Sequence, residues 1–223
     1  MTMFPPYNSF RKIKMKQIII VFATCLFFSF TNVSADESDT CACSVPLSVS
    51  LFSPIQTSPK EACVKGVRLN LIFGENAGVT GLDLGLLNFC HGDVKGLEIG
   101  AMNFVQKDFA GAQLGFVNLV KGDFYGFQRA LFNQVKGDFY GIQEGLINVV
   151  GQNLRGIELG WINVAREIHG VQFGFFNFSR NVEGLQLGIV NYTNSLKGVQ
   201  IGILNIQTNR RYVKVLPILN VNF

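Results

Sequence analysis

The chain has 223 residues, of which 48% are hydrophobic and 15% are charged. This composition excludes an intrinsically disordered chain, and the length suits one domain or a short repeat array. Four of the 19 basic residues precede Asp36 and none of the 15 acidic residues does, so the chain from Asp36 onward carries 15 charges of each sign. Balanced charge predicts no nucleic-acid partner.

The first 35 residues have the pattern of a secretory signal peptide. A basic cluster precedes the apolar run at 18–30, and small residues at Val33–Ala35 predict cleavage after Ala35. Met15 is an alternative start, and Cys25 leaves a lipoprotein signal as a second interpretation. The run is too short for a spanning helix.

Four cysteines follow the predicted cleavage site: Cys41, Cys43, Cys63 and Cys90. An even number in an exported chain favours disulfides, with Cys41 and Cys43 each pairing with Cys63 or Cys90. Such bonds would fasten an N-terminal cap (36–65) onto the rest of the chain. A Cys-x-Cys metal site is the alternative, which two His in the whole chain disfavour.

A repeat of the form Gly-h-x-h-Gly-h-h-Asn, where h is apolar, fills the rest of the chain. We number its positions from the first glycine, which recurs every 14 or 15 residues: Gly81, Gly96, Gly111, Gly126, Gly141, Gly156, Gly170, Gly184 and Gly198. Position 8 is always asparagine: Asn88, Asn103, Asn118, Asn133, Asn148, Asn163, Asn177, Asn191 and Asn205. Degenerate copies begin at Gly66 and end with Asn220, which defines a repeat domain at 66–223.

A unit this short and rich in Val, Ile, Phe and Leu is typical of strands and turns, so the fold class is all-β. Two architectures remain: a β-solenoid of about ten coils, or a transmembrane β-barrel with one strand per unit. In a barrel the asparagines at position 8 would face lipid, where nothing satisfies them. We therefore predict the solenoid, with the barrel as the alternative.

Stacked coils place equivalent positions one above the other, so the asparagines, with Asn220 last, would form a hydrogen-bonded ladder. We expect the apolar positions 2, 4, 7, 9 and 14 to fill the interior. The polar position 3 should then face outward. Arg129 and Glu144, both at position 4, should pair across adjacent coils.

The segments 170–177 and 184–191 resemble the bacterial surface-repeat proteins of spirochaetes and other Gram-negative bacteria. The resemblance covers roughly residues 45–223. It implies an exported protein of the outer membrane or cell surface, with a periplasmic or secreted location as the alternative. It supplies no catalytic or binding residues.

Few side chains suggest chemistry. His91 and His169 fall in turns without a matching nucleophile, so no catalytic residue is predicted. Asp93, Asp108, Asp123 and Asp138 share position 13, where stacked carboxylates could bind calcium or simply favour the turn. Tyr125 and Tyr140 are neighbours at position 15 and form a candidate surface patch for a glycan or protein.

Together these patterns predict a non-enzymatic surface repeat protein with a structural or adhesive role and no cofactor. Its partner would be an envelope or host protein or glycan, with outer-membrane association and end-to-end or edge self-association as further expectations. An integral outer-membrane barrel is the first alternative function, and a calcium-binding β-roll is the second.

Overall fold

The computed structural model describes residues 41–211 and 213–223. All the regular secondary structure of these residues is β-strand. No helix in this part of the chain is long and apolar enough to cross a membrane. The predicted signal peptide, with Cys25, lies outside the described residues. The strands are β1 (Cys43–Phe52), β2 (Ile55–Gln56), β3 (Ala62–Asn76), β4 (Gly78–Cys90), β5 (Val94–Val105), β6 (Phe109–Leu114), β7 (Val117–Val120), β8 (Phe124–Arg129), β9 (Phe132–Val135), β10 (Phe139–Phe173), β11 (Phe176–Leu187), β12 (Val190–Thr193), β13 (Ser195–Gln207) and β14 (Val215–Asn222).

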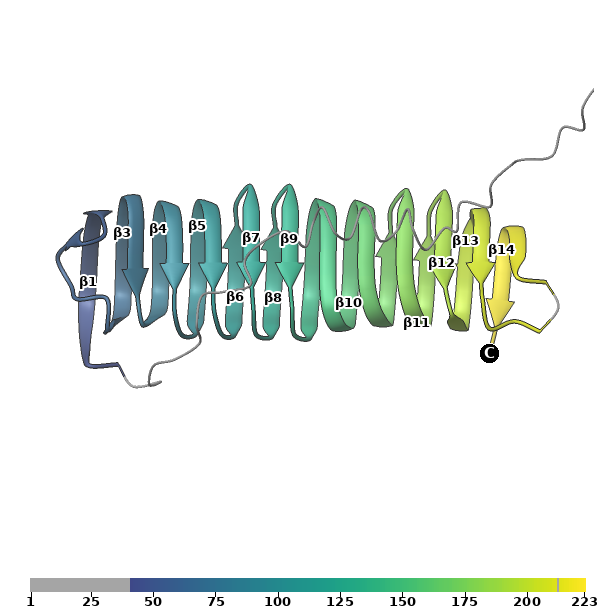
Figure 1. Ribbon diagram of the computed structural model, residues 1–223, viewed down its shortest axis with the longest axis horizontal. Coiled ribbons are helices and arrows are strands. Elements are labelled where there is room, and N and C mark those ends of the chain that lie inside the picture. The colour runs from purple at the N-terminus through teal and green to yellow at the C-terminus, as the bar shows by residue number, and fades with distance from the viewer. Residues whose placement is uncertain (1–40, 212) are drawn as a thin grey trace, which may run out of the picture. The chain divides into compact units, whose positions relative to one another are not determined.

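Successive repeats stack in parallel and in exact register. Gly81 pairs with Gly96 and Asn88 with Asn103 between β4 and β5, and the same positions pair along the stack. The result is a β-solenoid of about 11 coils (Figure 1), which confirms the predicted fold class. Because the repeats run in parallel instead of alternating in direction, the barrel alternative is wrong.

Glycine at position 1 lets neighbouring coils approach closely. These residues have φ between +130° (Gly126) and +156° (Gly170), a region that side chains rarely adopt. A Cβ on Gly141 would lie 1.9 Å from the carbonyl oxygen of Gly126 on the preceding coil. The periodic glycine is therefore a steric requirement of the stack.

Two columns of apolar side chains form the core. Position 14 is buried as predicted, and its phenylalanines stack with ring centroids 4.8 Å apart for Phe109 and Phe124 and 5.0 Å for Phe124 and Phe139. Position 10 supplies the second column, which includes Val105, Val120 and Val135. The first column continues to Leu196, whereas the second is apolar only as far as Ala165 and ends in the buried polar residues Ser179, Thr193 and Gln207.

The predicted orientation of the other positions is wrong. Position 3 points inward and is completely buried from Asp83 to Gln200, whereas positions 2, 4, 7 and 9 are exposed or half-buried. The prediction assumed that apolar residues occupy the interior. Here the interior positions are taken by amides that satisfy one another, which leaves much of the apolar surface outside.

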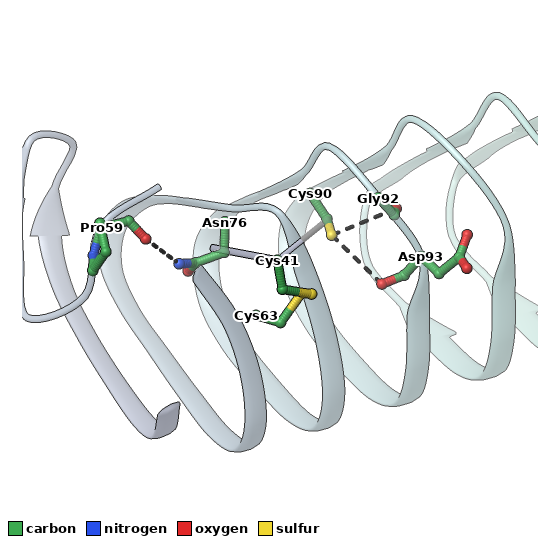
Figure 2. Close-up of a disulfide and its surroundings, with 7 residues drawn as sticks. All are labelled: Cys41, Pro59, Cys63, Asn76, Cys90, Gly92 and Asp93. Carbon is green, nitrogen blue, oxygen red and sulfur yellow. Dashed lines mark hydrogen bonds between the residues drawn. A yellow bond between two sulfur atoms is a disulfide. The ribbon is translucent and has the colours of Figure 1, made fainter. Parts of the chain in front are cut away.

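The N-terminal end carries a disulfide between Cys41 and Cys63, one of the predicted pairings (Figure 2). Cys43 and Cys90, the other two candidates, are free, the first exposed and the second buried. Cys90 donates weak hydrogen bonds to the carbonyls of Gly92 and Asp93 (Figure 2). Its burial raises the pKa of its thiol to about 12.

The C-terminal end is closed by a reversal of chain direction. The last strand, β14, pairs antiparallel with β13, opposite to the parallel pairing of the coils before it. Asn220 therefore lies beside Gln200 and donates to its Oε1 at 2.8 Å instead of following Asn205. The prediction that Asn220 continues the asparagine ladder is wrong, since it ends the column at position 3.

Candidate functional site

The most distinctive surface of the solenoid is apolar. Each coil turns a corner at positions 5 and 6, and the outward side chains on both sides of that corner are nearly all hydrophobic. We call this surface the apolar wedge and its most exposed column, position 6, the ridge. The ridge consists of Leu86, Ala101, Phe116, Leu131, Leu146, Trp161, Phe175, Ile189 and Ile203.

Two flanks extend from the ridge. Positions 2 and 4 form one flank: Leu82, Leu84, Leu97, Ile99, Ala112, Leu114, Phe127, Arg129, Ile142, Glu144, Ile157, Leu159, Val171, Phe173, Leu185, Leu187, Val199 and Ile201. Positions 7 and 9 form the other: Leu87, Phe89, Met102, Phe104, Val117, Leu119, Phe132, Gln134, Ile147, Val149, Ile162, Val164, Phe176, Phe178, Val190, Tyr192, Leu204 and Ile206. On the ridge, Phe116 is 63% exposed, Trp161 59% and Ile203 66%.

The wedge contains two charged side chains, and they are paired with each other. Arg129 Nε lies 3.6 Å from Glu144 Oε2 on the next coil, as the sequence predicted. Both are partly exposed, so the pair contributes little to stability in water. Its consequence for the surface is that the wedge has no net charge.

The asparagine ladder is buried beneath this surface. From Asn88 to Asn191, each Nδ2 donates to the Oδ1 of the following asparagine at 2.8–3.1 Å. The same nitrogen also reaches a backbone carbonyl, as Asn148 does with Leu159 at 2.8 Å. The predicted ladder is thus confirmed from Asn88 to Asn205.

A second buried polar column, at position 3, lies beside the asparagine ladder, and its hydrogen bonds point in the opposite direction along the stack. Here each glutamine Nε2 donates to the preceding coil, for example Gln128 to Gln113 at 2.7 Å and Gln143 to Gln128 at 2.6 Å. Hydrogen bonds to carboxylates interrupt the series at Glu98 and Glu158. Hydrogen bonds within the two columns satisfy most of the buried side-chain amides.

At its N-terminal end this column becomes charged. Arg68 and Asp83 form a completely buried ion pair, in which Arg68 Nε donates to Asp83 Oδ1 at 2.8 Å and a second bond joins Nη2 to Oδ2. Burial, together with the negative charge of Asp83, raises the pKa of Glu98 well above its ordinary value. A neutral Glu98 leaves the Arg68–Asp83 pair electrically balanced.

Glu158 is the third buried acid of the column. Burial raises the pKa of Glu158 to about 8, although the hydrogen bond from Gln172 opposes this rise. No cation is paired with this carboxyl in the described residues, so the protonated form predominates at neutral pH. The carboxylic acid then replaces a glutamine as a rung of the column.

The remaining predicted site residues lie apart from the wedge. The backbone amide of Asp123 donates to Asp108 Oδ1, and that of Asp138 to Asp123 Oδ1, both at 2.8 Å, so these carboxylates join successive turns. The described residues contain no group of three or more His, Cys, Asp or Glu side chains that could hold a metal ion. Tyr125 and Tyr140 stack at 4.8 Å, which shows that they are neighbours but identifies no ligand.

His91 also lies in a polar cluster. Its Nε2 is 2.5 Å from Glu75 Oε1, while Ser53 Oγ donates to the other carboxylate oxygen at 3.4 Å. The carboxylate thus lies between the hydroxyl and the imidazole. In a nucleophilic triad the imidazole must contact the hydroxyl directly, so this arrangement does not activate Ser53.

No known protein family, curated protein or solved structure matches the chain. The apolar wedge is the feature that sequence reasoning missed. The sequence nevertheless contains a sign that position 3 faces inward and its apolar neighbours outward. Position 3 is always Asp, Glu or Gln in the nine exact repeats. An exposed position would tolerate a wider range of residue types.

Proposed function

We propose that this is an exported, non-catalytic protein of the cell envelope that acts as a structural or adhesive element and binds through its apolar wedge. The observation that carries the proposal is the continuous exposed apolar surface of the wedge. The wedge spans nine coils at ~4.8 Å each, and two flanks of ~10 Å give it an area of ~900 Å². The largest apolar patch on an ordinary monomer is about 300–600 Å², and larger patches mark interaction sites.

The construction of the solenoid suits a binding surface. Each rung of the wedge is fixed by the ladders beneath it, so the side chains are presented on a rigid support. Binding then requires little ordering of the protein, which lowers its entropic cost. A rigid, repetitive surface is what a structural or adhesive role needs.

An exported location is consistent with two features of the chain. Residues 1–35 have the pattern of a secretory signal, and the Cys41–Cys63 disulfide is of a kind that persists in oxidising compartments. With the surface-repeat resemblance, they favour the outer membrane or the cell surface.

Cell fractionation tests this function. We expect the native protein in the envelope fraction, and expect a Phe116→Ser, Ile203→Ser double variant of the ridge to shift into the soluble exported fraction. Tyr125→Ser is the matched control, because it removes an exposed aromatic ring outside the wedge. Retention of native protein in the cytoplasm, or equal envelope binding by the ridge variant, would contradict the proposal.

A further inference from the structure

We infer that the partner of the apolar wedge is the acyl-chain region of a phospholipid bilayer, into one leaflet of which the ridge inserts along the length of the solenoid. This inference rests on the proposed function and names the partner of the same surface. It describes a protein that lies in the membrane interface with the long axis of the solenoid parallel to the membrane surface.

The shape of the wedge favours a fluid partner. The flanks meet at the corner of each coil, so the apolar surface is convex and its most exposed side chains form the crest. A flat protein surface would cover one flank and leave the other in water. Acyl chains can surround the ridge and contact both flanks together.

The areas weigh against a second copy of the chain. Face-to-face pairing through one flank would bury only ~450 Å² per partner, about half of the ~800 Å² that a stable interface buries on each side. The flank at positions 2 and 4 also carries Arg129 and Glu144, which already pair within one chain and leave no charge to match in another. A bilayer needs no such match.

The backbone of the wedge is already satisfied, as insertion into hydrocarbon requires. Coil-to-coil pairing uses the peptide groups of both flanks. Amides at the corner itself are bonded too: Gly115 N–H donates to the carbonyl of Arg129 and Phe116 N–H to that of Ala101, both at 3.0 Å. The buried asparagines and glutamines bond to one another, so transfer of the ridge from water into hydrocarbon breaks none of their hydrogen bonds.

The charge distribution indicates that an uncharged lipid is sufficient for binding. The wedge has no net charge, and the lysines and aspartates of the turns lie beyond position 10 of each coil. Attraction to anionic headgroups therefore contributes little, and the binding free energy comes from apolar burial. Uncharged phosphatidylcholine vesicles are accordingly the appropriate probe.

The chain provides its own reporter, since Trp161 is its single tryptophan and lies on the ridge. Full-length protein is mixed with phosphatidylcholine vesicles, with and without bromine on the acyl chains, at low and high salt. We expect a blue shift of Trp161 emission, strong quenching by brominated chains, and no loss of either effect in high salt. The Phe116→Ser, Ile203→Ser variant retains Trp161 and should lose most of the quenching, whereas Tyr125→Ser should behave like the native protein.

Three outcomes would contradict the inference, and a fourth would contradict only the proposed function. Unquenched Trp161 with vesicle-bound protein would mean that another segment, such as the apolar run at 18–30, provides the attachment. A blue shift that depends on protein concentration without vesicles would assign the wedge to a second copy. Envelope binding through the ridge without vesicle binding would overturn the lipid partner and leave the proposed function intact, whereas vesicle binding by a protein that stays in the cytoplasm would overturn the function alone.

Discussion

Glu158 is the rung that follows Gln143 in the buried column at position 3, and the Oε1 atoms of both are buried with no hydrogen-bond partner in the described part of the chain. Elsewhere in the column a glutamine Nε2 donates to the preceding Oε1, as Gln143 does to Gln128. A protonated Glu158 supplies the missing donor to Gln143. An ionised Glu158 would instead place two acceptors together.

Replacing Glu158 with glutamine should therefore stabilise the solenoid at neutral pH. The folded-state pKa is about 8 against an ordinary value of 4.5, so the unfolded chain releases this proton first. The stability contributed by protonated Glu158 is complete below about pH 4.5 and is lost as the pH rises to about 8. At about 1.4 kcal/mol per pKa unit, we expect Glu158→Gln to gain on the order of 3 kcal/mol at pH 7.

The measurement is denaturant unfolding of both proteins between pH 4 and 9. The variant should lose the part of the pH slope due to Glu158 and retain the part due to Glu98. Glu183→Gln is the matched control, because that carboxylate is exposed beside Lys197. An unchanged slope in Glu158→Gln would show that Glu158 is ionised in the folded protein.

The asparagine ladder should be sensitive to loss of a single rung. Asn148→Ala removes the acceptor of Asn133 and the donor to Asn163 inside a fully buried column. We expect a loss of about 3 kcal/mol in the free energy of unfolding, from unpaired amides and a small cavity. Asn209→Ala, on the exposed turn near the C-terminal end, should change stability by less than about 0.5 kcal/mol.

The free cysteines should differ sharply in reactivity. Cys43 is exposed, whereas Cys90 is buried and the pKa of its thiol is raised to about 12 by that burial. Brief alkylation of the native protein followed by peptide mass spectrometry should label Cys43 and leave Cys90 unmodified until denaturant is added. Rapid native labelling of Cys90 would mean that the N-terminal coils open readily.

The sequence was sufficient for the architecture because the solenoid imposes one requirement per coil. Gly141 and its equivalents must lack a Cβ, and Asn148 and its equivalents must bond to the coils on both sides, so both recur without exception in the exact repeats. These two constraints predict the period, the parallel stacking and the asparagine ladder.

Two features were harder to predict from the sequence: which side chains point inward, and the direction of the last strand. A general preference for apolar interiors predicted Ile142 inside and Gln143 outside. In the structure Gln143 is buried, where it bonds to Gln128, and Ile142 is exposed. Asn220 fits the repeat spacing, and no local residue pattern indicated that its strand runs antiparallel. The apolar wedge was missed because the apolar side chains that form it were expected to point into the interior.

The most direct test of the account is the accessibility of position 2, measured by single cysteines introduced in a Cys43→Ser background. The structure leaves Ile142 42% exposed on the wedge, while Val135 in the core column at position 10 is fully buried. In lipid-free solution a water-soluble maleimide should modify Ile142→Cys rapidly and Val135→Cys only after unfolding, with circular dichroism confirming that both variants are folded. Equal protection of the two cysteines would show that the apolar columns face inward and that the wedge does not exist.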